Sequence, residues 1–136
     1  MRAIKLARKA EGKTFPNPLV GAVIVKNGKI VGEGYHREVG TPHAEIVALR
    51  KAGKKARGAE LYVNLEPCAH HGKTPPCVDS IAKEGIRKVY AAMKDPNPLV
   101  NGKGADLLRK NGIKVKMGVC RPKAEELNKV YIRRFS

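Results

Sequence analysis

The stretch His43-Ala44-Glu45, followed by Pro67-Cys68 and later by Cys77, is the most informative part of this sequence. One imidazole and two thiolates form a typical zinc ligand set, and three protein ligands leave the fourth position of a tetrahedral site for water. A zinc ion with an open position acidifies its bound water and supports hydrolysis, whereas a structural zinc is closed by four protein ligands. We therefore expect His43, Cys68 and Cys77 to bind one Zn2+ per chain.

Glu45 is the predicted catalytic residue. It lies two positions after His43, at the expected start of a helix. A carboxylate in that place can take a proton from water and deliver it to a leaving group. Cys77 is also expected at a helix start, and helix amino termini favour thiolates and other negative charge.

The spacing of these residues resembles that of a known family. The pattern His-x-Glu followed by Pro-Cys-x-x-Cys is the signature of zinc nucleoside and nucleobase deaminases. Here Cys77 lies nine positions after Cys68, behind the insert 69–76, AHHGKTPP. With that insert the chain resembles the deaminase domain of the riboflavin-biosynthesis enzymes, the diaminohydroxyphosphoribosylaminopyrimidine deaminases. The agreement continues through 16–21 (PNPLVG), 32–36 (GEGYH) and 95–104 (DPNPLVNGKG), nearly the whole chain in order.

The resemblance implies a reaction and its partners. The substrate is 2,5-diamino-6-(5-phosphoribosylamino)pyrimidin-4(3H)-one, a small phosphorylated pyrimidine. Hydrolytic deamination gives 5-amino-6-(5-phosphoribosylamino)uracil and ammonia, an early step of riboflavin biosynthesis. The product goes to a reductase, either fused or separate. A homo-oligomer is also implied, because small deaminases of this type often complete their pockets at subunit contacts.

The resemblance also implies a set of substrate-binding residues. Prolines on both sides of Asn17 fix the backbone and leave an amide that is able to read a pyrimidine edge. Lys73, in a loop bounded by Gly and Pro, is predicted to bind the phosphate, because a flexible ammonium suits an anionic tail. Asp95 and Asn97 are expected to hold ribose hydroxyls or base nitrogens. The predicted substrate-binding residues are Asn17, His36, His70, Lys73, Asp95 and Asn97.

Apolar periodicity predicts an α/β domain. The Asn27-Gly28 pair indicates a hairpin, and Thr41 is the expected cap of the helix that begins at His43. A hairpin followed by crossovers predicts a mixed sheet with helices on both faces. This agrees with the fold that the resemblance implies, a cytidine-deaminase-like three-layer α/β/α sandwich with a five-stranded mixed sheet. The expected strands are 20–25, 30–34, 61–65, 88–93 and 113–119, and the expected helices are 3–10, from 43, 77–84, 104–110 and 123–134.

Length and cysteine content agree with this interpretation. The 136 residues are enough for one core, so we expect a single deaminase domain over 1–136 with no reductase domain in this chain. The sequence does not distinguish a stand-alone deaminase from an excised domain. Three cysteines do not suggest a disulfide framework, and Cys120 is expected to be a small, partly buried side chain. No stretch approaches the roughly 20 apolar residues of a membrane span, so a cytoplasmic location without membrane contact is expected.

The formal charge of +16 raises alternatives. A basic surface favours phosphate-rich partners, but here Lys and Arg are scattered and are not interleaved with aromatic residues, so we do not expect nucleic acid as a partner. One alternative is a tRNA or nucleoside deaminase, which shares the metal ligands but not the nine-position cysteine spacing. Another is a non-enzymatic, zinc-stabilised RNA-binding module, in which Glu45 would have no purpose and a fourth protein ligand would be expected.

Overall fold

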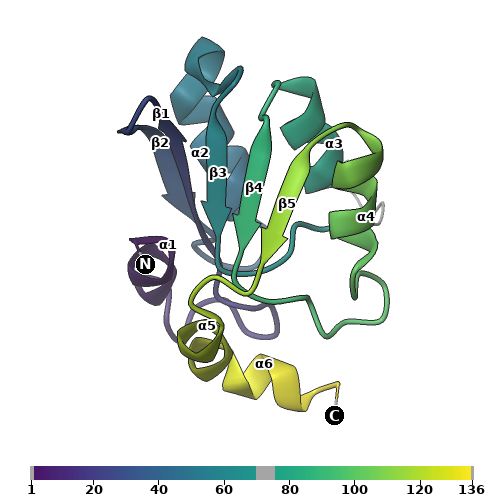
Figure 1. The fold of residues 1–136 in the computed structure, drawn as a ribbon. Helices are drawn as coiled ribbons and strands as arrows, with labels where there is room; N and C mark the ends of the chain where they lie inside the picture. Colours follow the sequence, from purple (N-terminus) through teal and green to yellow (C-terminus); the bar gives the residue numbers. More distant parts are fainter. Residues whose placement is uncertain (1, 70–75, 136) are drawn as a thin grey trace.

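The computed structural model describes residues 2–69 and 76–135 and contains a five-stranded sheet with helices around it (Figure 1). The predicted fold class is confirmed. Two predicted substrate residues, His70 and Lys73, lie outside the described residues. In chain order the elements are α1 (Arg2–Arg8), β1 (Gly21–Lys26), β2 (Lys29–Tyr35), α2 (Ala44–Ala52), the 3-10 helix η1 (Gly53–Ala56), β3 (Glu60–Val63), α3 (Cys77–Lys83), β4 (Lys88–Ala91), α4 (Lys103–Lys110), β5 (Lys114–Met117), α5 (Arg121–Leu127) and α6 (Lys129–Arg133).

The sheet is mixed, with the order β2-β1-β3-β4-β5. β1 pairs with β2 and β3 in antiparallel fashion, whereas β3, β4 and β5 run parallel. The predicted hairpin is confirmed, with Asn27 and Gly28 at positive φ values of 52° and 75° in the turn. The carboxyl ends of the three parallel strands point toward α5 and α6 (Figure 1), and ligand sites of α/β sheets gather at such an edge.

Alternating side chains of the strands supply two separate cores. Ala22 and Ile24 of β1 belong to the main core, which fills the space between the sheet and α2, α3 and α4. Val23, between them in sequence, points to the other face and packs with Ala3 and Leu6 of α1. A third cluster joins α1, the ends of the parallel strands, α5 and α6. This arrangement fixes the strand ends that carry the site.

Glycines in β2 allow α2 to lie directly on the sheet. A Cβ atom on Gly34 would come within 2.6 Å of Val47 Cβ, and one on Gly32 within 2.4 Å of the Ala48 carbonyl oxygen. Any side chain at these two positions would push α2 away from β2. Since α2 begins directly after His43, this close packing sets the position of the predicted zinc ligand.

Three local predictions were wrong. The expected helix 123–134 is divided into α5 and α6, because the Asn128 side chain binds the backbone of Leu19 and the backbone of Asn128 leaves the helical conformation at φ −108° and ψ 27°. Thr41 does not cap α2, since its hydroxyl donates to the Glu38 carbonyl, 2.7 Å away, and His43 occupies the cap position. Cys120 is exposed, with φ 57° immediately before α5.

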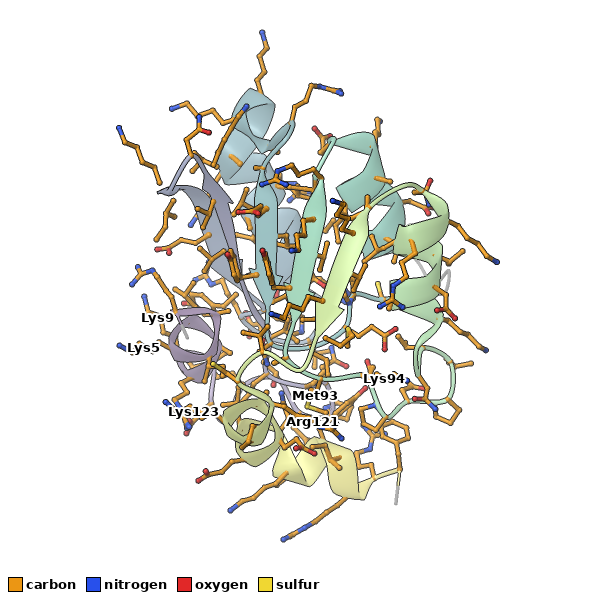
Figure 2. The ribbon with its side chains drawn as sticks, viewed as in Figure 1. Lys5, Lys9, Met93, Lys94, Arg121 and Lys123 are labelled. Atoms are coloured by element: carbon orange, nitrogen blue, oxygen red, sulfur yellow. The ribbon has the colours of Figure 1, made fainter. Side chains whose placement is uncertain are left out.

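Positive side chains extend from many sides of the molecule (Figure 2). Lys5 and Lys9 point outward from α1 at the left of the view, whereas Lys94 lies on the other side, after β4. The expectation that nucleic acid is not a partner stays a prediction. Within 2–69 and 76–135, no helix is long and apolar enough to cross a membrane. The cytoplasmic location also stays a prediction.

Candidate active site

Three separate elements bring the predicted zinc ligands together. His43 is the residue before α2, Cys77 is the first residue of α3, and Cys68 lies in the loop that follows β3. The main chain of α3 itself approaches Cys68, because the amide of Cys77 donates to Cys68 Sγ at 3.1 Å. His43 is exposed, Cys68 is partly buried and Cys77 is buried, so the group opens to one side.

The spacing of the donor atoms suits a zinc ion. His43 Nδ1 lies 3.3 Å from Cys77 Sγ and 3.8 Å from Cys68 Sγ. All three donor atoms lie within 4.8 Å of one another. A tetrahedral site with metal–ligand bonds of about 2.1–2.3 Å has ligands about 3.5–3.8 Å apart, so little movement is needed for the three to coordinate one ion. Among the residues that the structure describes, this is the one group of this kind.

The surroundings of Cys68 favour its thiolate form. Hydrogen bonds from the Cys77 thiol, the His43 ring and the Cys77 amide lower the pKa of Cys68 to about 4. The thiolate in turn raises the pKa of His43 above its ordinary value through their hydrogen bond. Because metals bind thiolates rather than thiols, Cys68 is prepared for a cation. The hydrogen bond to Cys68 raises the pKa of Cys77, so this second thiol gives up its proton when a metal binds.

Glu45 lies in the first turn of α2, 3% exposed, beside this donor group. Burial, together with the negative charge of Cys68, raises the pKa of its carboxyl to about 7. A buried carboxyl of this kind is typical of groups that both accept and return protons. Glu45 and the donors His43 and Cys68 line one cavity of about 400 Å3.

Asn17 and His36 line the same cavity and contact each other. His36 Nδ1 lies 3.3 Å from the Pro42 carbonyl, which can only accept, so this nitrogen carries the proton. Nε2 then accepts from the Asn17 amide at 3.2 Å. Burial lowers the pKa of His36, which agrees with a neutral ring. The contact therefore orients the Asn17 side chain with its amide nitrogen toward His36.

Asp95 and Asn97 also line the cavity, in the loop after β4. Asp95 Oδ1 accepts hydrogen bonds from the backbone amide of Asn97 at 3.0 Å and from the Tyr131 hydroxyl at 2.7 Å. The structure thus brings the four described residues predicted to bind the substrate, together with Glu45, His43 and Cys68, around one cavity. Their individual roles stay predictions.

Glu66 is a buried carboxylate that sequence reasoning missed. It accepts backbone hydrogen bonds from Asp95, Gly102 and Ala105 at 2.9–3.1 Å. It thereby fixes the loop after β4 and the start of α4 to the segment that carries Cys68. A charged residue directly after an apolar strand and directly before Pro67 was a signal that could have identified it.

Asn64 and Asn128 were missed as well. Asn64 is fully buried, and it accepts from the Gly21 amide at 2.8 Å and donates to the Leu19 carbonyl at 2.9 Å. Asn128 donates to the same carbonyl and accepts from the Leu19 amide. These two amides hold the chain between Asn17 and β1 in place at the edge of the cavity.

The fold and the donor set define a class, the zinc-dependent deaminases with a cytidine-deaminase-like fold. Over residues 1–93 the chain matches the family described as the cytidine and deoxycytidylate deaminase zinc-binding region. The predicted enzyme class, a deaminase of the cytidine and deoxycytidylate deaminase superfamily, is confirmed by this match. The match to this family and the donor group of His43, Cys68 and Cys77 both support zinc as the metal of this site.

Individual relatives narrow this class. The chain is 60% identical over 126 residues to the riboflavin biosynthesis protein RibD of Aquifex aeolicus, covering 93% of this chain and 35% of the relative. It is 53% identical over 134 residues to the diaminohydroxyphosphoribosylamino-pyrimidine deaminase of Buchnera aphidicola, covering 98% and 91%. A solved structure of RibD from Acinetobacter baumannii superposes with a TM-score of 0.96 at 50% identity, over 99% of this chain and 38% of that one. The chain therefore belongs to the diaminohydroxyphosphoribosylaminopyrimidine deaminase family, and it spans about a third of the length of its RibD relatives.

Proposed function

We propose that this chain deaminates 2,5-diamino-6-(5-phosphoribosylamino)pyrimidin-4(3H)-one to 5-amino-6-(5-phosphoribosylamino)uracil. The observation that carries the proposal is the position of Glu45 beside the donor group of His43, Cys68 and Cys77, at a cavity whose lining includes the four described residues predicted to bind the substrate. The name of the Buchnera relative, of which this chain covers 91%, supports the substrate.

His43, Cys68 and Cys77 are the residues that would hold the metal. Bound there, Zn2+ acidifies a water ligand and supplies a nucleophile near neutral pH. Glu45 is the proposed proton carrier, because it is buried in the first turn of α2, two positions after the proposed metal ligand His43. Its burial also keeps bulk water from competing for the proton.

The reaction replaces one bond by another at the carbon between the two ring nitrogens. A C–O bond forms with water, and the bond from this carbon to the exocyclic amino group breaks. Glu45 moves one proton of the water to the ring nitrogen and a second to the amino group, which leaves as ammonia. The ring then carries a carbonyl, and no oxidant or reductant is needed.

Asn17 and His36 are proposed to orient the pyrimidine. Because the Asn17 amide nitrogen is directed to His36 Nε2, its carbonyl oxygen is the end suited to a donor on the base edge. Asp95 and Asn97 are assigned to the ribosyl part of the substrate, since both belong to the loop that lines the cavity after β4. His70 and Lys73 retain their sequence-based assignments to the substrate.

A reductase is the proposed consumer of the product. The chain covers only 35% of the Aquifex RibD, and the Thermotoga maritima relative, 48% identical, is described as a deaminase and a 5-amino-6-(5-phosphoribosylamino)uracil reductase. We propose a reductase, fused or separate, as the next enzyme. The homo-oligomer and the single deaminase domain over 1–136 also stand as proposals.

Ammonia release by zinc-loaded protein tests the function. The substrates are the diaminopyrimidine phosphate, cytidine and a tRNA anticodon stem, assayed in parallel. We expect ammonia from the diaminopyrimidine phosphate alone, together with the absorbance change of the uracil product. Turnover of tRNA or cytidine without turnover of the diaminopyrimidine would overturn the proposal and assign the chain to another branch of the superfamily.

A further inference from the structure

One face of the carboxyl-terminal helical segment is bound, at three successive turns, to the loops that border the cavity. Asn128, Tyr131 and Arg134 follow one another at intervals of three residues, so they share a face of α6 and its two ends. Asn128 binds the backbone of Leu19, Tyr131 binds Asp95, and Arg134 binds the Pro16 carbonyl. This side of α6 therefore contacts both proline-bounded loops of the site.

Tyr131 and Arg134 also line the cavity itself. Tyr131 is only 9% exposed, and its hydroxyl donates to Asp95 Oδ1 at 2.7 Å. Arg134 is exposed, so it lies where the cavity meets solvent. The helix is thus part of the wall that a substrate would touch, in addition to its contact with α5.

The charges around the cavity make Arg134 distinctive. Glu45, Glu66 and Asp95 are the acidic side chains that line it. Within the described part of the chain, Arg134 is the one Lys or Arg among the lining residues. A substrate with a phosphate group would be repelled by the carboxylates unless a cation neutralised it, and a bidentate guanidinium is well suited to a phosphate.

Arg134 is also held in one orientation. Its Nη1 donates to the Pro16 carbonyl at 2.8 Å, and its guanidinium carbon lies 5.7 Å from the centre of the Phe135 ring. A guanidinium has five N–H donors, so this bond leaves others for a ligand. An arginine that is already oriented loses less conformational entropy when an anion binds.

The geometry points to Arg134 as a ligand of the substrate phosphate, with α6 as a specificity-determining wall of the site. This inference rests on the proposed function, which places the reacting carbon near the metal donors and the phosphate at the other end of the ribosylamino arm. The phosphate carries several acceptor oxygens, so it can accept two N–H donors of one guanidinium side by side. A substrate that lacks the phosphate gains nothing from Arg134.

The test compares two substrates that differ only in the phosphate. The diaminopyrimidine ribosylamino 5′-phosphate and the corresponding dephosphorylated riboside are assayed with wild type, Arg134→Gln, Arg134→Lys and the neighbouring control Arg133→Gln. For Arg134→Gln we expect KM for the phosphorylated substrate to rise about 10- to 100-fold with kcat nearly unchanged, which is the size of one charged hydrogen-bonding pair. The kcat/KM for the riboside should stay within about twofold, and Arg134→Lys should recover part of the lost affinity.

An independent measurement uses ribose 5-phosphate as a competitive inhibitor. Its inhibition constant should rise in Arg134→Gln and stay at the wild-type value in Arg133→Gln. Equal losses on both substrates would mean that Arg134 only holds the Pro16 loop, and no loss on the phosphorylated substrate would remove it from the site; either result overturns the inference while the proposed function stands. Failure of wild type on the phosphorylated substrate would overturn the proposed function and the inference with it.

Discussion

Asn128 binds Leu19 with both ends of its side-chain amide. Oδ1 accepts from the Leu19 amide at 2.8 Å, and Nδ2 donates to the Leu19 carbonyl at 2.8 Å, across 109 positions of sequence. Asn64 donates to the same carbonyl. The buried Asn128 side chain thus pairs with the Leu19 backbone as a neighbouring strand would, in the segment between Asn17 and β1.

Asn128→Ala should destabilise the protein by about 2–4 kcal/mol. It removes two hydrogen bonds and leaves the half-buried Leu19 backbone amide without this partner, whereas the Leu19 carbonyl keeps its bond from Asn64. Urea unfolding at equilibrium measures the change. Asn101→Ala, at an exposed position, is the control and should change the free energy of unfolding by less than about 0.5 kcal/mol. Equal effects in both variants would contradict the importance of the Asn128 pair.

Glu66→Gln should also lower the free energy of unfolding by about 2–4 kcal/mol. The carboxylate accepts from three backbone amides, and a Gln side chain would turn an NH2 group toward at least one of them. The same urea measurement is used, with the exposed Glu84→Gln as the matched loss of charge. A stable Glu66→Gln protein would show that these amides find other acceptors.

Zinc content should depend on Cys77 and not on Cys120. Wild type and Cys120→Ala are expected to bind one zinc ion per chain, because Cys120 is exposed and outside the donor group. Cys77→Ala leaves two of the three donors, so most of the metal should be lost on dialysis. Elemental analysis of the dialysed proteins gives the answer. Full zinc content in Cys77→Ala would exclude this group as the metal site.

The sequence predicted the elements of the sheet because their signals are local. Asn27-Gly28 identifies a hairpin by itself, and the apolar strands and the three metal donors are recognisable from residue type and spacing. The mixed sheet followed from a hairpin and later crossover connections, and the position of Cys68 after a strand followed from the apolar run 61–65.

The features that the sequence did not predict depend on contacts between residues that are far apart in the chain. Nothing near Asn128 in the sequence shows that it binds Leu19, so the division of the last helix into α5 and α6 was not predictable from helix propensity. Tyr131 and Asp95 are likewise 36 positions apart. Glu66 stands directly before Pro67-Cys68, but its three amide partners come from the segment 95–105 and are not evident from its sequence neighbours.

Gly34→Ala should destabilise the protein by about 1–3 kcal/mol, because the added methyl group overlaps Val47 on α2. Val47→Ala removes Cγ1, which the added methyl group would meet at 2.5 Å, and keeps Cβ, so the double variant should recover part of the stability that the sum of the two single changes predicts to be lost. Thermal and urea unfolding of the four proteins form a double-mutant cycle. Additive effects would mean that the contact with Val47 Cγ1 does not limit position 34.

Glu45→Gln should separate metal binding from chemistry. The amide has nearly the same shape, so the His43, Cys68 and Cys77 donors remain and one zinc ion per chain is expected by elemental analysis. A neutral amide cannot carry a proton, so kcat for the diaminopyrimidine phosphate should fall by about 10²- to 10⁴-fold. Glu126→Gln, at an exposed position of α5, should keep wild-type kcat. Because zinc content is measured on the same sample, a loss of activity with full zinc assigns the proton transfer to Glu45, and retained turnover would assign it to another group.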